Sequence, residues 1–152
     1  MTSKVVLEMI VEGRLDRVAK NASQAGRMLR SCLQHLETAD LRADADPSGS
    51  YALLYDAARK AVAAHMLFHG LRVTSRPGAH AAVVTYAEAE LVRVGGDHLE
   101  NLDRMRRTRN DTEYEERPIS EQEVRNDLAH ARFLVQEIGR SLFPPKDTKA
   151  QK

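Results

Sequence analysis

A dense run of charged residues, RRTRNDTEYEE at positions 106–116, is the part of this sequence whose residue types are best suited to chemistry. It ends a helical stripe that begins apolar and becomes charged, formed by Leu99, Leu102, Arg106, Arg109 and Glu113. Because unpaired charges are costly to bury, these side chains must pair with one another or line a polar site. Arg109 and Glu113, four residues apart, can pair directly. The run therefore predicts either a polar site or an internally paired helix end.

A second set of polar residues lies on the helix expected over about 48–70. Tyr55, Asp56 and Arg59 are the residues of this helix best placed to face the charged run. Asp56 could balance the arginines of that run, or pair with Lys60 four residues later as a surface contact. We therefore treat Tyr55, Asp56 and Arg59 as candidate nucleic-acid-binding residues.

The histidines and the loop after this helix offer weaker candidates. His65 and His69 have the spacing at which two imidazoles can share a zinc ion, but no glutamate follows His65 as in the HExxH pattern. Ordinary helix histidines are therefore favoured, and no metal site is expected. Arg72, Arg76 and His80 flank the loop and could contact phosphate. Glycine-rich phosphate loops and paired catalytic carboxylates are absent from the sequence, and we expect no cofactor.

Length and composition indicate a single globular domain. The chain has 152 residues, 42% hydrophobic and 30% charged, which is enough to bury a hydrophobic core. Since the net charge is only +1, nucleic-acid binding would have to come from local clustering. The lone Cys32 cannot form an internal disulfide, and neither a signal peptide nor a membrane-spanning segment is recognisable. We therefore expect a cytoplasmic protein with no membrane contact.

Apolar residues recur at helical spacing along the whole chain, which predicts an all-α fold. The expected elements are a short helix over 4–12, a helix from Asn21 or Ser23 to the acidic stretch before Asp46, and helices over about 48–70, 79–93, 97–114 and 121–143. Connections are expected over 13–19 and 71–78, and the expected caps include Asp46 with Pro47, Asp97, and Ser120 with Glu123. These elements predict an up-down bundle of four to five main helices plus the short N-terminal helix. The domain would span 1–143, followed by a disordered tail over 144–152.

Three patches, taken with the helix order, resemble a known family. They are SYALLYDAARKAVAAHMLFHGLR at 50–72, GAH at 78–80 and RN-x-x-E-Y at 109–114. Over roughly residues 5–143 the chain is similar to the HEPN superfamily of prokaryotic helical proteins, and closest to an actinobacterial branch of it. The resemblance implies a HEPN-like bundle that usually forms a homodimer.

The resemblance also implies an activity. HEPN proteins include metal-independent ribonucleases, whose signature is an arginine, commonly followed by a polar residue, and then a histidine after four to six intervening residues. Carried over to this chain, Arg109 takes the arginine position and Asn110 the polar position, while Tyr114 falls at the histidine position. Tyrosine, with a reference pKa of about 10, exchanges protons poorly near neutral pH. The implied catalytic residues are Arg109, Asn110, Glu113 and Tyr114, with added positive charge from Arg106 and Arg107.

The segment RNDLAH at 125–130 matches the same signature literally. Arg125 supplies the arginine, Asn126 the polar residue and His130 the histidine. The match lies on the last helix, whereas the family order places the motif on the helix before it. It therefore stands as an alternative site.

Two functional hypotheses of different classes follow. In the first, a HEPN-like protein engages RNA or a nucleotide through its arginine-rich site, in a toxin–antitoxin, defence or stress-response setting; as an enzyme it would be a metal-independent endoribonuclease. In the second, a non-catalytic module binds a protein partner such as a nucleotidyltransferase antitoxin or a DNA-repair component. Affinity that falls steeply with salt would favour the first hypothesis, and an exposed apolar patch would favour the second.

Overall fold

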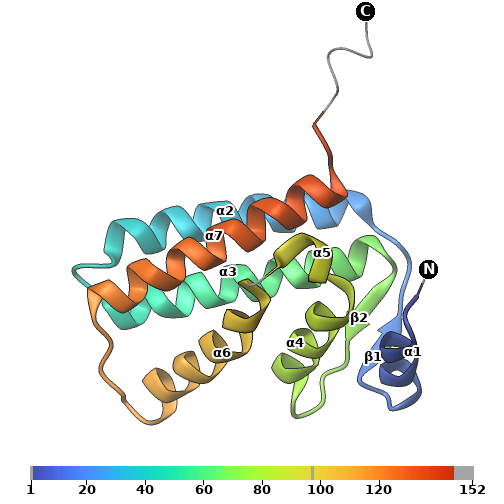
Figure 1. The fold of residues 1–152 in the computed structure, drawn as a ribbon, viewed down its shortest axis with the longest axis horizontal. Helices are drawn as coiled ribbons and strands as arrows, with labels where there is room; N and C mark the ends of the chain where they lie inside the picture. The colour runs from blue at the N-terminus through green and yellow to red at the C-terminus, as the bar shows by residue number, and fades with distance from the viewer. Residues whose placement is uncertain (1, 97, 146–152) are drawn as a thin grey trace, which may run out of the picture.

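The computed structural model describes residues 2–96 and 98–145, which form the mainly helical bundle that the sequence predicts (Figure 1). The elements are α1 (Lys4–Val11), β1 (Leu15–Arg17), α2 (Ala22–Arg42), α3 (Pro47–Phe68), β2 (Leu71–Val73), α4 (Ala79–Glu90), α5 (Val92–Gly95), α6 (His98–Tyr114) and α7 (Glu121–Leu142). The long helices α2, α3 and α7 run along one another, and α4 and α6 extend from the short α5 on one side of them.

Small side chains allow the long helices to pack closely. Four alanines of α3 are fully buried, namely Ala57, Ala58, Ala61 and Ala64. Small residues let neighbouring backbones approach, and α3 contacts both α2 and α7 along its length. The central helix α3 is therefore a well-supported element for the polar side chains Tyr55 and Arg59 that it carries.

The helix ends follow the capping residues that the sequence predicts. Asn21 caps α2, and Asp46 accepts a hydrogen bond from the Gly49 amide at 3.1 Å, with Pro47 as the first residue of α3. Ser120 and Glu123 form both bonds of a capping box at the start of α7. These caps fix where the long helices begin.

Two parts of the secondary structure differ from the prediction. The segments expected as connections each contain three residues that pair as antiparallel strands, β1 with β2, in the register Leu15↔Val73. Strands of three residues are too short to show a period of two in the sequence. The helix expected over 79–93 divides at Leu91 into α4 and α5, where Leu91 leaves the helical conformation.

Some predictions fall on residues beyond those described. The expected cap Asp97 lies outside the described residues, as does most of the tail expected over 144–152. Across the ranges 2–96 and 98–145, no helix has the length and apolar character needed to cross a membrane.

A buried hydrogen-bonded carboxylate holds α6 against the long helices. Asp127 on α7 is only 4% exposed. Its carboxylate accepts a hydrogen bond from the Tyr51 hydroxyl of α3 at 2.7 Å and one from Arg104 Nη1 of α6 at 2.9 Å. Because a buried carboxylate requires such partners, these three side chains fix how α6 lies on α3 and α7.

Gly95, buried in α5 where the chain passes from α4 to α6, has no room for a side chain. A Cβ there would lie 2.8 Å from Leu99 Cγ and 3.2 Å from Leu134 Cδ1. Gly95→Ala should therefore lower the free energy of unfolding by about 1–3 kcal/mol through overpacking, as measured by urea denaturation. The control is Gly139→Ala on α7, where a Cβ would meet no other part of the described chain within 4 Å; it should be neutral or stabilise by about 0.5–1 kcal/mol. Equal responses of the two variants would contradict the prediction.

Candidate functional site: an arginine–histidine cluster

Residues from three helices converge where α4 begins beside α3 and α6. Tyr55 and Arg59 lie on α3, His80 lies in the first turn of α4, and Arg106 and Arg109 lie on α6. We call these five residues the arginine–histidine cluster. Tyr55 is buried, with its hydroxyl oxygen 3.4 Å from His80 Nδ1 and the two ring centroids 5.8 Å apart. This contact between α3 and α4 sets the position of the imidazole.

The charges of the arginines act on both ring side chains. Burial lowers the pKa of His80 below its ordinary value, and the positive charges of Arg59 and Arg109 lower it further. Burial raises the pKa of Tyr55 to about 12. The positive charges of the three arginines act in the opposite direction but do not cancel this effect. Because such effects fade with distance, the guanidinium groups lie within electrostatic range of the two rings. At neutral pH the cluster thus holds an uncharged imidazole and an uncharged phenol among cationic side chains.

Each arginine of the cluster also has a carboxylate partner on its own helix. The pairs are Asp56 with Arg59, Asp103 with Arg106 (2.9 Å) and Glu113 with Arg109 (2.7 Å). The Arg109–Glu113 pair is the one that the sequence predicts. Asp56 bonds to Arg59 and Lys60 of its own helix, so no ion pair joins it to the arginines of α6 within the described residues. The charged helix end is thus internally paired, and the charges of Arg106 and Arg109 still act on the rings of Tyr55 and His80.

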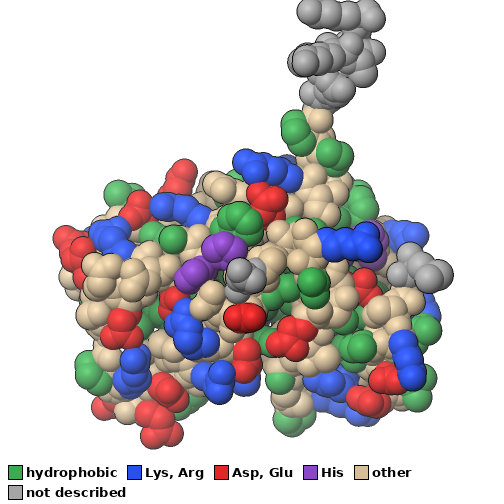
Figure 2. Space-filling view, viewed as in Figure 1, with side chains coloured by type: hydrophobic (Ala, Val, Ile, Leu, Met, Phe, Trp, Pro, Cys, Tyr) green, Lys and Arg blue, Asp and Glu red, His purple; other side chains and the backbone are tan. Residues whose placement is uncertain are grey.

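A surface depression of about 510 Å³ gives a ligand access to one side of the cluster. Arg59, Arg72 and His80 line it, together with the carboxylate of Asp16. Its volume lies within the range of about 300–1,000 Å³ that small-molecule sites occupy. Figure 2 shows Lys and Arg side chains, with Asp and Glu side chains among them, on the face that carries α6 and α4. Arg59 and His80 of the cluster are therefore accessible to a ligand through this depression, whose described lining comes from β1, α3, β2, α4 and the loop before α4.

The other predicted residues of α6 make no hydrogen bond or ion pair with Tyr55 or His80 within the described residues. Tyr114, the last residue of the helix, is 72% exposed. Arg107 pairs with Asp103 at 3.3 Å and has a largely exposed side chain, and Asn110 is half-buried. Within the part of the chain that the structure describes, no hydrogen bond or ion pair joins Tyr114 to the cluster. Arg106 and Arg109 are the residues of the run 106–116 whose charges act on both rings.

The alternative motif RNDLAH separates its arginine from its histidine. Arg125 pairs with Asp40 on α2, whereas His130 faces α6 with its Nδ1 2.8 Å from His98 Nδ1. Asn126 accepts a hydrogen bond from Gln122 within α7 at 2.8 Å. Both ends of the motif border one open depression of about 500 Å³. Their functional groups nevertheless have partners on different neighbouring helices.

His80 is the member of the cluster that the sequence places in neither the catalytic set nor the nucleic-acid-binding set of candidate residues. From the sequence it is expected only as a phosphate contact beside the loop at 71–78. The GAH patch was the available signal, because it places a histidine in the first turn of a helix. No spacing relates residue 80 to residues 106 and 109, so their convergence emerges only from the packing of α4 against α6.

Metal ligands do not gather in the described part of the chain: no three His, Cys, Asp or Glu side chains there are placed to hold a metal ion. His65 is buried, with Nδ1 2.7 Å from the Tyr86 hydroxyl, and burial lowers its pKa to about 4. Its ring lies beside that of His69, at a centroid distance of 4.6 Å. The two histidines therefore belong to a polar contact between α3 and α4.

Scans against protein-family models, curated proteins and solved structures find no match. The interpretation of the arginine–histidine cluster therefore depends on its own residues and geometry.

Proposed function

We propose that this protein is HEPN-like and binds RNA or a nucleotide at the arginine–histidine cluster, in a toxin–antitoxin, defence or stress-response setting. The observation that carries the proposal is the contact between Tyr55 of α3 and His80 of α4, with three arginines from α3 and α6 close enough for their charges to act on both rings. Guanidinium groups bind phosphate through paired, charge-assisted hydrogen bonds. Their present carboxylate partners are partly exposed, and exposed ion pairs contribute only about 0–1 kcal/mol. A phosphate can therefore replace a carboxylate at little cost. As in the family it resembles, we expect the protein to form a homodimer.

His80 supplies the proton-exchanging group that position 114 lacks. Its neutral imidazole can accept the proton of an RNA 2′-hydroxyl as the 2′-oxygen bonds to phosphorus. The P–O5′ bond then breaks, and the imidazolium returns the proton to the leaving 5′-oxygen. Arg106 and Arg109 stabilise the negative charge that develops on the phosphorane. The activity that these side chains suit is metal-independent cleavage of RNA.

Arg109→Ala is the variant that tests this function. The purified protein is incubated with end-labelled tRNA in EDTA, and binding is measured in parallel by filter retention at several salt concentrations. We expect the variant to lose cleavage and to bind RNA about tenfold more weakly, since charge-assisted hydrogen bonds contribute about 1.5–3 kcal/mol. The wild-type affinity should fall steeply with salt.

The matched control is Arg140→Ala, which removes an arginine paired with Glu137 near the C-terminal end of α7 (Figure 1). Its RNA affinity should stay close to that of the wild type. Circular dichroism must show that both variants are folded to the same extent as the wild type. Equal affinities of the two variants, or a wild type that binds no RNA, would contradict the proposal.

A second candidate function, binding of a partner such as a nucleotidyltransferase antitoxin or a DNA-repair component, is favoured by apolar side chains on α1. Val11 is 88% exposed and Leu7 is 44% exposed. Both line a shallow depression of about 260 Å³ that Lys4, Glu8 and Glu12 also border. Neighbouring exposed apolar groups with a polar rim are typical of protein contacts. A wild type that binds no RNA would favour this function.

A further inference from the structure

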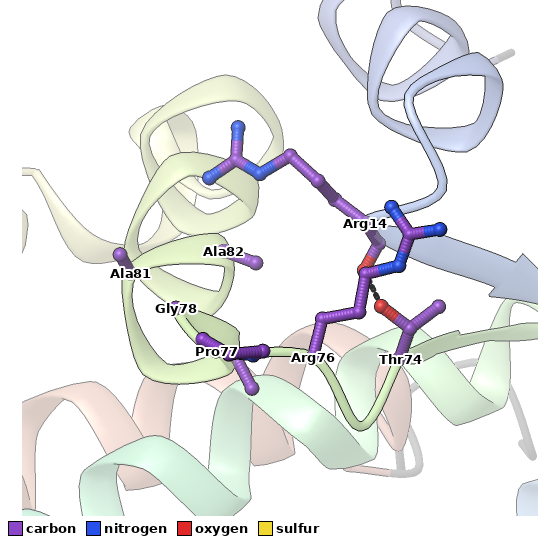
Figure 3. Close-up of a pocket in the computed structure, with 8 residues that line it drawn as sticks. Arg14, Thr74, Arg76, Pro77, Gly78, Ala81 and Ala82 are labelled. Carbon is purple, nitrogen blue, oxygen red and sulfur yellow. Dashed lines mark hydrogen bonds between the residues drawn. The ribbon is translucent and has the colours of Figure 1, made fainter.

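A cavity of about 270 Å³ lies beside the first turn of α4, next to the depression at the cluster. Figure 3 shows that Arg14 extends across to α4 from just before β1, and that Arg76 reaches from the loop toward the Arg14 segment. The cavity and the depression share Thr74 and Ala79 among the residues that line them. The two hollows are therefore adjacent, on either side of the loop that leads into α4.

Hydrogen bonds to the backbone and to a threonine hold the two arginines at this cavity. Arg14 Nη2 donates to the Thr85 hydroxyl of α4 at 3.3 Å, and Arg76 Nη1 donates to the Glu12 carbonyl oxygen at 3.3 Å. The guanidinium of Arg76 lies against Gly13, where a Cβ would come within 3.0 Å of Nη1. Residues far apart in the sequence are thus brought to one hollow in a defined arrangement.

The cavity is positively charged. Within residues 2–96 and 98–145, neither Arg14 nor Arg76 forms an ion pair, and no acidic side chain lines the cavity. The arginines of the cluster differ, because each of them has a carboxylate partner. Unpaired guanidinium groups around a hollow attract anions and suit phosphate in particular. Thr74 adds a hydroxyl at the rim, although it already donates to the Gly13 carbonyl oxygen at 2.8 Å.

We propose that the cavity between Arg14 and Arg76 binds a second phosphate of the RNA strand whose scissile phosphate lies at the arginine–histidine cluster. The ligand of the protein is then an oligonucleotide strand that passes over the loop before α4, rather than a mononucleotide. This inference rests on the proposed function, because it places the first phosphate at the cluster. Phosphate contacts of this kind position a strand without reading its sequence.

The test compares Arg14→Gln/Arg76→Gln with a variant that removes the same charge elsewhere, Arg27→Gln/Arg30→Gln on the exposed side of α2. Binding of a labelled single-stranded oligoribonucleotide, of labelled adenosine monophosphate and of inorganic phosphate is measured by anisotropy or calorimetry. We expect Arg14→Gln/Arg76→Gln to weaken oligoribonucleotide binding about tenfold. The slope of log affinity against log salt should shrink by about 0.7 for each arginine. Mononucleotide affinity should not change, and the α2 variant should bind like the wild type.

Each other outcome overturns the proposal in a distinct way. If Arg109→Ala loses oligoribonucleotide binding but Arg14→Gln/Arg76→Gln does not, the cavity is no part of the strand path while the proposed function stands. If the wild type binds none of the three ligands, the proposed function and this inference fail together. A third outcome is that inorganic phosphate binds the wild type but not Arg14→Gln/Arg76→Gln, while the oligoribonucleotide affinity is unchanged. The cavity would then be a site for a free anion. Equal thermal midpoints of both double variants would exclude misfolding as the cause.

Discussion

Asp127→Ala should lower the free energy of unfolding by about 3 kcal/mol, because removing one member of a buried polar network leaves its partners unsatisfied. Asp127 is 4% exposed, and its carboxylate is shared by the Tyr51 hydroxyl and the Arg104 guanidinium. In the variant the Tyr51 hydroxyl is buried without its acceptor. Arg104, whose side chain is 45% exposed, can turn to water, which keeps the loss below that of a fully buried ion pair. Urea denaturation followed by circular dichroism measures the loss.

Glu137→Ala is the control for Asp127→Ala, because it removes a carboxylate from the same helix and breaks the exposed pair with Arg140. Its effect should stay within about 0.5 kcal/mol. The double variant Asp127→Ala/Arg104→Ala should lose less free energy of unfolding than the sum of the losses in the two single variants, since both substitutions remove the same interaction. An Asp127→Ala protein as stable as Glu137→Ala would show that α6 does not depend on this carboxylate.

His80→Asn should reduce the rate of RNA cleavage at least about 100-fold, the lower end of what general acid–base catalysis contributes. Asparagine keeps a polar side chain next to the Tyr55 hydroxyl but cannot accept a proton near neutral pH. RNA affinity should change little, because the arginines that hold the phosphate remain. The measurement is single-turnover cleavage of end-labelled tRNA in EDTA, with affinity determined in parallel.

The pH profile distinguishes a proton-transfer role from a structural one. The neutral form of His80 is the base, and its pKa lies below the ordinary value of 6.5 because of burial and the charges of Arg59 and Arg109. The wild-type rate should therefore rise with pH through that lowered pKa and be level above it, already near pH 7. The His80→Asn protein should lose this rise. The control His130→Asn changes the histidine of RNDLAH and should keep both the rate and the profile; loss of cleavage in this control would instead assign the site to RNDLAH.

The helices could be predicted from the sequence because their signals are local. Asp46 before Pro47, and Ser120 three residues before Glu123, specify helix starts without reference to the rest of the fold. The division at Leu91 and the pairing of β1 with β2 depend on contacts between distant segments, so no local pattern indicates them. The helical stripe likewise placed Arg106 and Arg109 together, and the helix over about 48–70 was the expected neighbour, but no local pattern related His80 of α4 to them.

The residue of RNDLAH that matters most for stability is not one that defines the motif. The motif is defined by its arginine and its histidine, whereas the buried residue is Asp127 between them. Asp127 can be buried because Tyr51 of α3 and Arg104 of α6 bind its carboxylate. No regular sequence spacing relates these two partners to Asp127. His80 presents the same difficulty, because its neighbours come from two other helices.

The distribution of buried residues along α6 makes its two halves unequal in local stability. Among the described residues of this helix the buried ones are Leu99, Leu102 and Met105, so the segment from Arg106 to Tyr114 has no fully buried side chain. Local opening of such a segment exposes little apolar surface and therefore requires little free energy, whereas opening α3 would disrupt the whole core. Two of the cluster's arginines thus belong to the most easily unfolded part of the site, and two other members belong to its most stable helix. A bound phosphate would protect the backbone amides of the last turns of α6 from solvent exchange, and the ordering of these turns would reduce the net affinity.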